Sequence, residues 1–291
     1  MFEGFTQRKI EANGVAINCR IGGTGKPVLL LHGYPQTHVM WHKIAPRLAE
    51  RYTVVASDLR GYGDSAKLPG DPEHKTYSKR VMAADQAALM QALGHERFML
   101  IGHDRGARVA HRLTLDHGAR VEKLAVVDIV PTLDAFGAMD QDRATAYSHW
   151  FFLIQPDGLA ERLIGNDPAF WLKWCLNRWG GNGLDYFGEA AIAEYVRCFS
   201  DPAAIHASCE DYRAGASIDM VYDREDLGRQ VTCPTFALWG NRGRLHTWWD
   251  VIACWRARCA NLTGKSLPAG HFLVEERPED AAAELAGFLA A

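Results

Sequence analysis

The sequence predicts an α/β fold in which a mostly parallel sheet, flanked by helices, is interrupted by a helical cap. Three observations support this prediction. Apolar β-branched runs alternate with amphipathic helical segments up to residue 131, aromatic-rich helical periodicity fills residues 132–225, and a strand pattern resumes at residue 235. Continuous apolar runs of this kind are typical of strands buried on both faces of a sheet. We therefore expect a core of residues 1–131 and 226–291 and an inserted cap of residues 132–225.

The strand pattern is clearest in short apolar runs. Strands are expected at residues 28–31, 53–56, 98–101, 124–128 and 235–239, with a weaker candidate at 262–267. Residues 78–93 have the spacing of an amphipathic helix. Ligands of open α/β sheets bind beyond the carboxyl ends of the strands, so we expect the cap to close over that edge.

Composition narrows the classes of partner. The 291-residue chain has a net charge of −3 and a pI near 6.5, which favours neither a nucleic acid nor a membrane surface. Its N-terminus lacks the basic and apolar regions of a signal peptide, and no apolar run approaches the roughly 18 residues of a membrane span. We expect a cytoplasmic protein with a small-molecule substrate.

The cysteines indicate neither disulfides nor a metal site. There are seven, scattered from Cys19 to Cys259, with no C-x-x-C pair and no His/Cys spacing of a zinc site. We expect reduced and mostly buried thiols. A phosphate-binding glycine loop is also missing from the sequence, so we predict no metal and no cofactor.

The strongest chemical signal is the segment Gly102-His103-Asp104-Arg105-Gly106, which follows an apolar run and precedes a helical pattern. A sharp turn from strand to helix holds its central residue in strained geometry and projects that side chain above the sheet, and small neighbours are needed for it. The projecting residue here is an aspartate, and the chain contains no G-x-S-x-G segment. We predict Asp104 as a nucleophile. His103 is expected to have a structural role beneath the turn.

An aspartate nucleophile implies a particular reaction. A carboxylate with an ordinary pKa of about 3.9 is anionic at neutral pH, so it can displace a leaving group from an sp³ carbon without a base. The product is an ester on the enzyme. Hydrolysis of that ester needs a base for water, an acid that orients the base, and donors for an oxyanion.

The sequence offers a candidate for each of these roles. His271 follows the last strand pattern, where the base comes last in the order nucleophile, acid, base. Residues 239–243, after the strand that follows the cap, contain no carboxylate, so Asp128 at the end of an earlier strand is the predicted orienting acid and Asp134 the reserve. Each of these residues also has a plain structural reading, a loop histidine or a turn cap. The backbone N–H groups of Tyr34 and Arg105 are the predicted oxyanion donors.

Four motifs together resemble one family. They are the H-G-x-P turn at residues 32–35, the segment D-L-R-G-Y-G-D-S at 58–65, the aspartate turn at 102–106 and the late G-H-F at 270–272. The chain is similar along its whole length to the α/β-hydrolases with an aspartate nucleophile, which include haloalkane dehalogenases, epoxide hydrolases and fluoroacetate dehalogenases. This resemblance implies the α/β-hydrolase fold.

The substrate class is indicated by two arginines and three cap residues. Arg105 and Arg108 lie one and four residues after the nucleophile, where both can face one side of the pocket and hold a planar carboxylate. His149, Trp150 and Tyr212 can converge as hydrogen-bond donors on a small leaving anion. The alternative for each is ordinary packing or solvation.

This combination closely resembles fluoroacetate dehalogenases. The resemblance implies hydrolysis of a small haloacetate through an Asp104 ester, with His271 and Asp128 activating water, and a homodimer. Separately, the near-helical spacing of Trp171, Trp174 and Trp179 predicts that Trp179 is a pocket wall. The nearest alternative is an epoxide hydrolase that uses Asp104 and two cap tyrosines. The cap tyrosines available for that role are Tyr147, Tyr186, Tyr195 and Tyr212. A non-catalytic ligand receptor with the same fold is the third reading.

Overall fold

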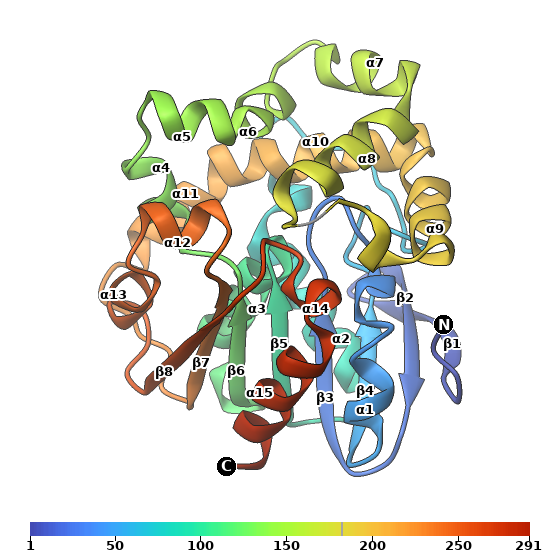
Figure 1. Ribbon diagram of the computed structural model, residues 1–291, viewed down its shortest axis with the longest axis vertical. Coiled ribbons are helices and arrows are strands. Elements are labelled where there is room, and N and C mark those ends of the chain that lie inside the picture. The colour runs from blue at the N-terminus through green and yellow to red at the C-terminus, as the bar shows by residue number, and fades with distance from the viewer. Residues whose placement is uncertain (182) are drawn as a thin grey trace.

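The structure is a computed structural model that describes residues 1–181 and 183–291. Its centre is an eight-stranded sheet in the order β1-β2-β4-β3-β5-β6-β7-β8 (Figure 1). β1 and β2 form an antiparallel hairpin, β2 is antiparallel to β4, and the pairs from β4 to β8 are parallel. The strands are β1 (Thr6–Ala12), β2 (Val15–Gly22), β3 (Lys26–Leu31), β4 (Tyr52–Ser57), β5 (Phe98–His103), β6 (Val121–Val127), β7 (Thr235–Gly240) and β8 (Leu262–Leu267). The predicted fold class is confirmed.

The sequence patterns located six of these strands but not the N-terminal hairpin. β1 lies at the edge of the sheet and its residues are mostly exposed, so it has no apolar run to identify it. β3 to β6 are each longer than expected, and β6 ends at Val127, so Asp128 lies just beyond the strand rather than in it. β8 has the predicted bounds.

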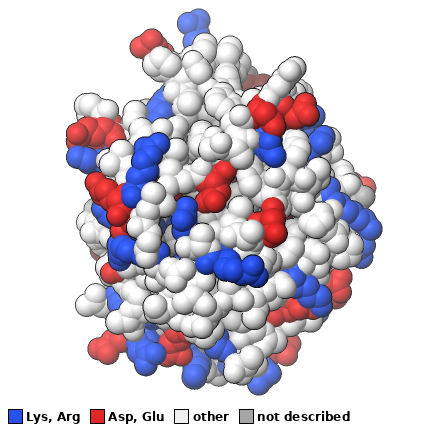
Figure 2. All heavy atoms as spheres, turned by 90° about the vertical axis from the view of Figure 1, so that its left-hand side faces the viewer, with Lys and Arg blue, Asp and Glu red and all other residues white. Residues whose placement is uncertain are grey.

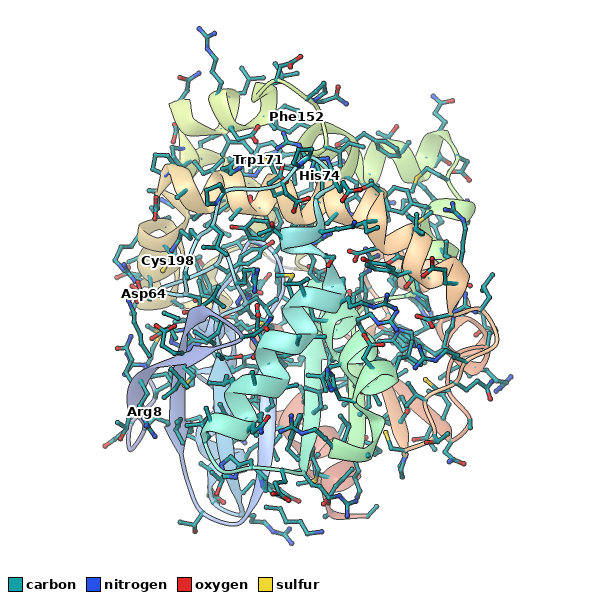
Figure 3. All side chains as sticks on the ribbon, turned by 180° about the vertical axis from the view of Figure 1, so that it is seen from behind. Arg8, Asp64, His74, Phe152, Trp171 and Cys198 are labelled. Carbon is teal, nitrogen blue, oxygen red and sulfur yellow. The ribbon has the colours of Figure 1, made fainter. Side chains whose placement is uncertain are left out.

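Helices cover both faces of the sheet. α2 (Lys79–Ala92) and α3 (Arg105–Asp116) pack on the face in front in Figure 3, and α1 (Ala45–Ala49) and α15 (Pro278–Ala290) lie on the opposite face, in front in Figure 1. The apolar residues of β3 and β5 are fully buried between these layers, as expected for central parallel strands. Shorter elements complete the core: η1 (His38–Trp41), η2 (Lys75–Tyr77), η3 (Gly118–Arg120), α12 (Arg244–Trp248), α13 (Val251–Arg256) and α14 (Leu273–Glu276).

Between β6 and β7 the described residues form helices that lie across the top of the sheet in Figure 1. They are α4 (Thr132–Gly137), α5 (Gln141–Ala146), α6 (Ser148–Leu153), α7 (Leu159–Asn166), α8 (Pro168–Trp179), η4 (Asp185–Phe187), α9 (Glu189–Phe199), α10 (Pro202–Ala216) and α11 (Ile218–Glu225). Aromatic contacts connect them: Phe152 and Trp171, both labelled in Figure 3, have ring centroids 5.1 Å apart. We call this segment the cap.

A buried ionic network joins the cap to the core. Asp211 on α10 accepts hydrogen bonds from the side chains of Lys79 on α2 and Arg105 on α3, and from the Tyr62 hydroxyl at 2.6 Å. Burial alone would raise the pKa of Asp211, but Arg105 and Lys79 outweigh it and hold that pKa well below its usual range. Removing one partner from such a network leaves a buried charge unpaired, which costs about 3–5 kcal/mol.

Along the described parts of the chain, no helix has the length and apolar content needed to cross a membrane. No group of three or more His, Cys, Asp or Glu side chains there could hold a metal ion. The face shown in Figure 2 mixes acidic and basic side chains rather than gathering one sign.

Candidate active site

The nucleophile candidate lies at the turn between β5 and α3. Asp104 has φ 48° and ψ −120°, a positive-φ geometry that costs a non-glycine residue about 1–3 kcal/mol. This is the strained turn that the sequence predicts. The Asp104 side chain lines a cavity beneath the cap.

The H-G-x-P turn approaches Asp104 closely. The Tyr34 backbone N–H donates to Asp104 Oδ2 at 3.0 Å. A Cβ atom on Gly33 would lie 2.5 Å from the Asp104 Cβ atom, so only glycine allows this approach. The Arg105 N–H, the second predicted oxyanion donor, makes no hydrogen bond to Asp104 within the described part of the chain.

His271 and Asp128 form a hydrogen-bonded pair. His271 Nδ1–H donates to Asp128 Oδ2 at 2.6 Å, while Asp128 Oδ1 accepts from the Gly240 N–H at 2.9 Å. Asp128 itself has a positive φ of 49°. Asp134, the reserve candidate, instead contacts Arg258 at 3.2 Å. The imidazole is thus fixed by a carboxylate that the end of β7 orients in turn.

Electrostatics define the protonation states. Burial raises the pKa of Asp104, but its interactions with His271, His103 and the two arginines outweigh that effect, so the net shift is downward and the carboxylate stays ionised. Burial lowers the pKa of His271, yet the hydrogen bond and charge of Asp128 give a net rise. Burial lowers the pKa of His103 to about 3, and its Nε2–H donates to the His271 carbonyl at 2.8 Å. His103 therefore supports the His271 backbone as a neutral group.

Arg108 lines the cavity, and two of its guanidinium nitrogens have no hydrogen-bond partner in the described part of the chain. The residue is buried, and its Nε and Nη2 atoms have no hydrogen-bond partner among the described residues. Its Cζ atom lies 5.0 Å from the centroid of the Trp150 ring. Burial, followed by the charge of Arg105, lowers the pKa of Arg108. An unpaired buried cation of this kind suits an anionic ligand.

Arg105 is held differently. Its Nε and Nη2 atoms donate to Asp211, and its Cζ atom lies 3.8 Å from the centroid of the Tyr212 ring. Of the two arginines, the described cavity wall includes Arg108 and not Arg105. This differs from the expectation that both face the pocket, because the buried Asp211 carboxylate draws the Arg105 guanidinium toward α10. Contact between Arg105 and a substrate stays a prediction.

The three predicted anion donors line the same cavity, together with Trp179. The ring centroids of His149 lie 4.2 Å from Trp179 and 5.8 Å from Tyr212. Burial lowers the pKa of His149 to about 3, so its ring is neutral, and its Nδ1 atom is buried without a described partner. Neutral N–H and O–H donors can therefore surround a small anion here.

The cavity has a volume of about 330 Å³ and is lined by residues of the cap, of the loop after β7 and of the core turns that carry Asp104, Asp128 and His271. Its outer part includes three exposed arginines, Arg178, Arg242 and Arg244, for which the described residues provide no ion-pair partner. Asp104 and Asp128 are the described acidic residues that line it. The exposed side of the cavity is therefore cationic, and the nucleophile candidate Asp104 lies among its partly buried lining residues.

Sequence reasoning missed two contributors. The Gly240 N–H orients Asp128, and Asp211 binds Arg105. Asp211 adjoins the predicted donor Tyr212, so the need of a buried arginine for a carboxylate was the available signal. The Gly240 N–H could not be identified in this way, because every residue except proline has a backbone N–H and the sequence does not show which one will meet Asp128.

The fold and the site define a hydrolase with an aspartate at the nucleophile turn, and the chain belongs to the α/β-hydrolase family, whose model matches residues 26–278. It is 50% identical to the fluoroacetate dehalogenase of a Burkholderia species, over 99% of this chain and 95% of that protein. It is 34% identical to the soluble epoxide hydrolase of Corynebacterium sp. strain C12, over 94% and 93%. The solved structure of ALR0039 from Nostoc sp PCC 7120 superposes with a TM-score of 0.98 at 55% identity, covering 99% of each chain. The resemblance to fluoroacetate dehalogenases is confirmed.

Proposed function

We propose that this protein hydrolyses the carbon–halogen bond of small haloacetates and converts fluoroacetate and water to glycolate, fluoride and a proton. The observation that carries the proposal is the Arg108 guanidinium, which is buried in the cavity with Asp104 and has Nε and Nη2 unpartnered among the described residues. A substrate carboxylate supplies the partner that Arg108 lacks. The relative named fluoroacetate dehalogenase supports the same substrate class.

In the proposed first step Asp104 Oδ1 attacks the halogen-bearing carbon. A new C–O bond forms as the C–F bond breaks, and the electron pair leaves with fluoride. The side chains of His149, Trp150 and Tyr212 donate hydrogen bonds to the departing anion. Donors placed in a dry pocket are effective because water does not screen them.

In the proposed second step His271 Nε2 takes a proton from water, and the oxygen of that water attacks the ester carbonyl carbon of Asp104. Asp128 accepts from Nδ1–H and stabilises the imidazolium. The oxyanion on Oδ2 accepts from the N–H groups of Tyr34 and Arg105. Collapse breaks the bond to glycolate, which regains a proton from His271, and the Asp104 carboxyl group releases its proton to solvent.

An epoxide hydrolase is the second candidate, because Tyr147 and Tyr212 both line the cavity and could protonate an epoxide oxygen. Tyr195 is engaged elsewhere, since its hydroxyl donates to Glu275 at 2.9 Å. A neutral epoxide, however, would leave the Arg108 charge unpaired. We therefore rank the haloacetate first.

The deciding experiment measures halide release from fluoroacetate and chloroacetate, and diol formation from a small epoxide, with Asp104→Asn as the control. Halide release that the substitution abolishes is the expected result. Turnover of the epoxide alone would refute the haloacetate proposal and leave the nucleophile assignment in place. The predicted homodimer and cytoplasmic location belong to the same proposal, and light scattering of the purified protein tests the former.

A further inference from the structure

The loop that carries His271 is fixed by a carboxylate outside the catalytic set. Glu276, the last residue of α14, accepts the Gly270 N–H on Oε2 at 2.8 Å and the Phe272 N–H on Oε1 at 3.1 Å. These two donors lie immediately before and after His271. Phe272 is the N-cap residue of α14, so the hydrogen bond from its N–H lies at the start of that helix. Gly270 lies outside the helix, so helix capping does not account for the hydrogen bond from the Gly270 N–H.

The same carboxylate reaches the cap. Glu276 Oε2 also accepts the Gly181 N–H at 3.1 Å, and the His271 N–H donates to the Trp179 carbonyl at 3.1 Å. A Cβ atom on Gly270 would lie 2.6 Å from the Gly181 nitrogen, so the two backbones touch. The segment 179–181 includes the cavity wall residue Trp179. The hydrogen bonds of Glu276 and the bond between His271 and Trp179 therefore hold the His271 loop and this part of the cavity wall together.

We infer that Glu276 is a positioning residue that fixes the His271 loop and couples it to the cap segment 179–181. Its three acceptor contacts leave the loop little freedom to shift, and His271 can take a proton from the attacking water only within a narrow range of positions. A displacement of 1 Å can cost about a hundredfold in rate. The kinetic part of this inference rests on the proposed two-step function, in which His271 acts only on the ester.

The test compares Glu276→Gln with Glu276→Asp. The glutamine has one acceptor oxygen and brings an NH₂ group against backbone donors, whereas the aspartate keeps the charge on a shorter side chain. We expect halide release in the first turnover to stay within about twofold of wild type for both variants. Ester hydrolysis should slow by about tenfold or more in Glu276→Gln, giving a burst of halide and accumulation of the ester, with a smaller effect in Glu276→Asp.

Two neighbouring glutamates provide matched controls. Burial raises the pKa of Glu275 to about 8, so Glu275→Gln changes little charge, and its carboxyl binds Gln36 and Tyr195 rather than the His271 loop. Glu279 pairs with Arg47 at the surface, at 2.8 Å. Neither Glu275→Gln nor Glu279→Gln should produce a burst. Equal slowing of both chemical steps in Glu276→Gln, or no slowing, would overturn the inference.

Amide hydrogen exchange tests the contacts without any substrate. In Glu276→Gln we expect faster exchange in peptides covering residues 268–273 and in those covering 179–181, relative to both controls. Unchanged exchange in either segment would overturn the coupling. Because this measurement does not depend on turnover, failure of the haloacetate proposal and failure of the positioning role give different results.

Discussion

Arg108→Met should impair activity without lowering stability, whereas Arg105→Met should lower stability, although the two arginines lie only three residues apart. Arg108 has Nε and Nη2 unpartnered in the cavity, while Arg105 is bound to Asp211. Leaving a substrate carboxylate buried without its partner costs about 3–5 kcal/mol. At 1.36 kcal/mol per tenfold change, Arg108→Met should lower kcat/KM for chloroacetate by about 10² to 10⁴. Most of the loss should be in KM, because the carboxylate is bound similarly before and during the reaction.

The order of the two variants should be reversed for stability: Arg105→Met should lose the more. Unsatisfied buried donors cost about 1–3 kcal/mol, and because Arg108 lines an open cavity in the free protein its cost lies at the lower end, roughly 1 kcal/mol. Arg108→Met should therefore leave Tm unchanged or raise it by about 2–4 °C. Arg105→Met removes one of the two cations from the buried Asp211 and should lower the free energy of unfolding by about 3 kcal/mol.

The assay pairs steady-state kinetics with thermal unfolding for both variants, and Arg108→Lys tests whether charge alone suffices. A lysine keeps the charge but loses the bidentate geometry, so we expect partial recovery of KM. The reasoning fails if Arg108→Met keeps wild-type KM, or if it destabilises the protein as much as Arg105→Met does.

Three further predictions concern the base and the cavity mouth. His271→Gln should release one halide per active site and then stop with the ester on Asp104, which intact mass spectrometry detects; continued turnover would refute the base assignment. Burial lowers the pKa of His271, but Asp128 gives a net rise above 6.5, and only the neutral imidazole accepts a proton. We therefore expect kcat to fall as pH drops through this raised pKa and Asp128→Asn to move that limb to lower pH, whereas an unmoved limb would contradict the pairing. Replacing Arg178, Arg242 and Arg244 together with Gln should lower kcat/KM for chloroacetate at low salt by about two- to fivefold and weaken its salt dependence. Chloroacetamide is the neutral control, and an equal loss with it would exclude steering.

Residues of the candidate site could be predicted from the sequence where function forces a local pattern. The turn around Asp104 needs a strand before it and small neighbours beside it, so the segment 102–106 was recognisable. His271 follows the last strand and Asp128 follows β6, and the edge where parallel strands end brings both to one place. β3 to β7 could be found because buried parallel strands have continuous apolar runs, whereas β8 is an edge strand with mostly exposed or half-buried residues and was only a weaker candidate.

Contacts between distant segments left no such pattern. Arg105 and Asp211 are separated by 106 residues, so spacing along α3 suggested two equivalent arginines where the structure separates them. β1 has little apolar sequence because it is an exposed edge strand, and in β2 the polar residues Asn18 and Arg20 interrupt the apolar ones. The role of Glu276 depends on α14 turning back onto the His271 loop, which residue types alone do not indicate.

The contact between Tyr34 and Asp104 sets a balance between the two proposed steps. The Tyr34 N–H already holds Asp104 Oδ2 in the free protein, at 3.0 Å, which leaves Oδ1 to attack. Oδ2 then becomes the ester carbonyl oxygen and, when water adds, the oxyanion. The carboxylate loses charge in the first step, so this hydrogen bond weakens there, whereas negative charge concentrates on Oδ2 in the second step and strengthens it. The same N–H therefore opposes ester formation slightly and favours ester hydrolysis, so the halide donors, whose hydrogen bonds strengthen as negative charge develops on the leaving group, must drive the first step.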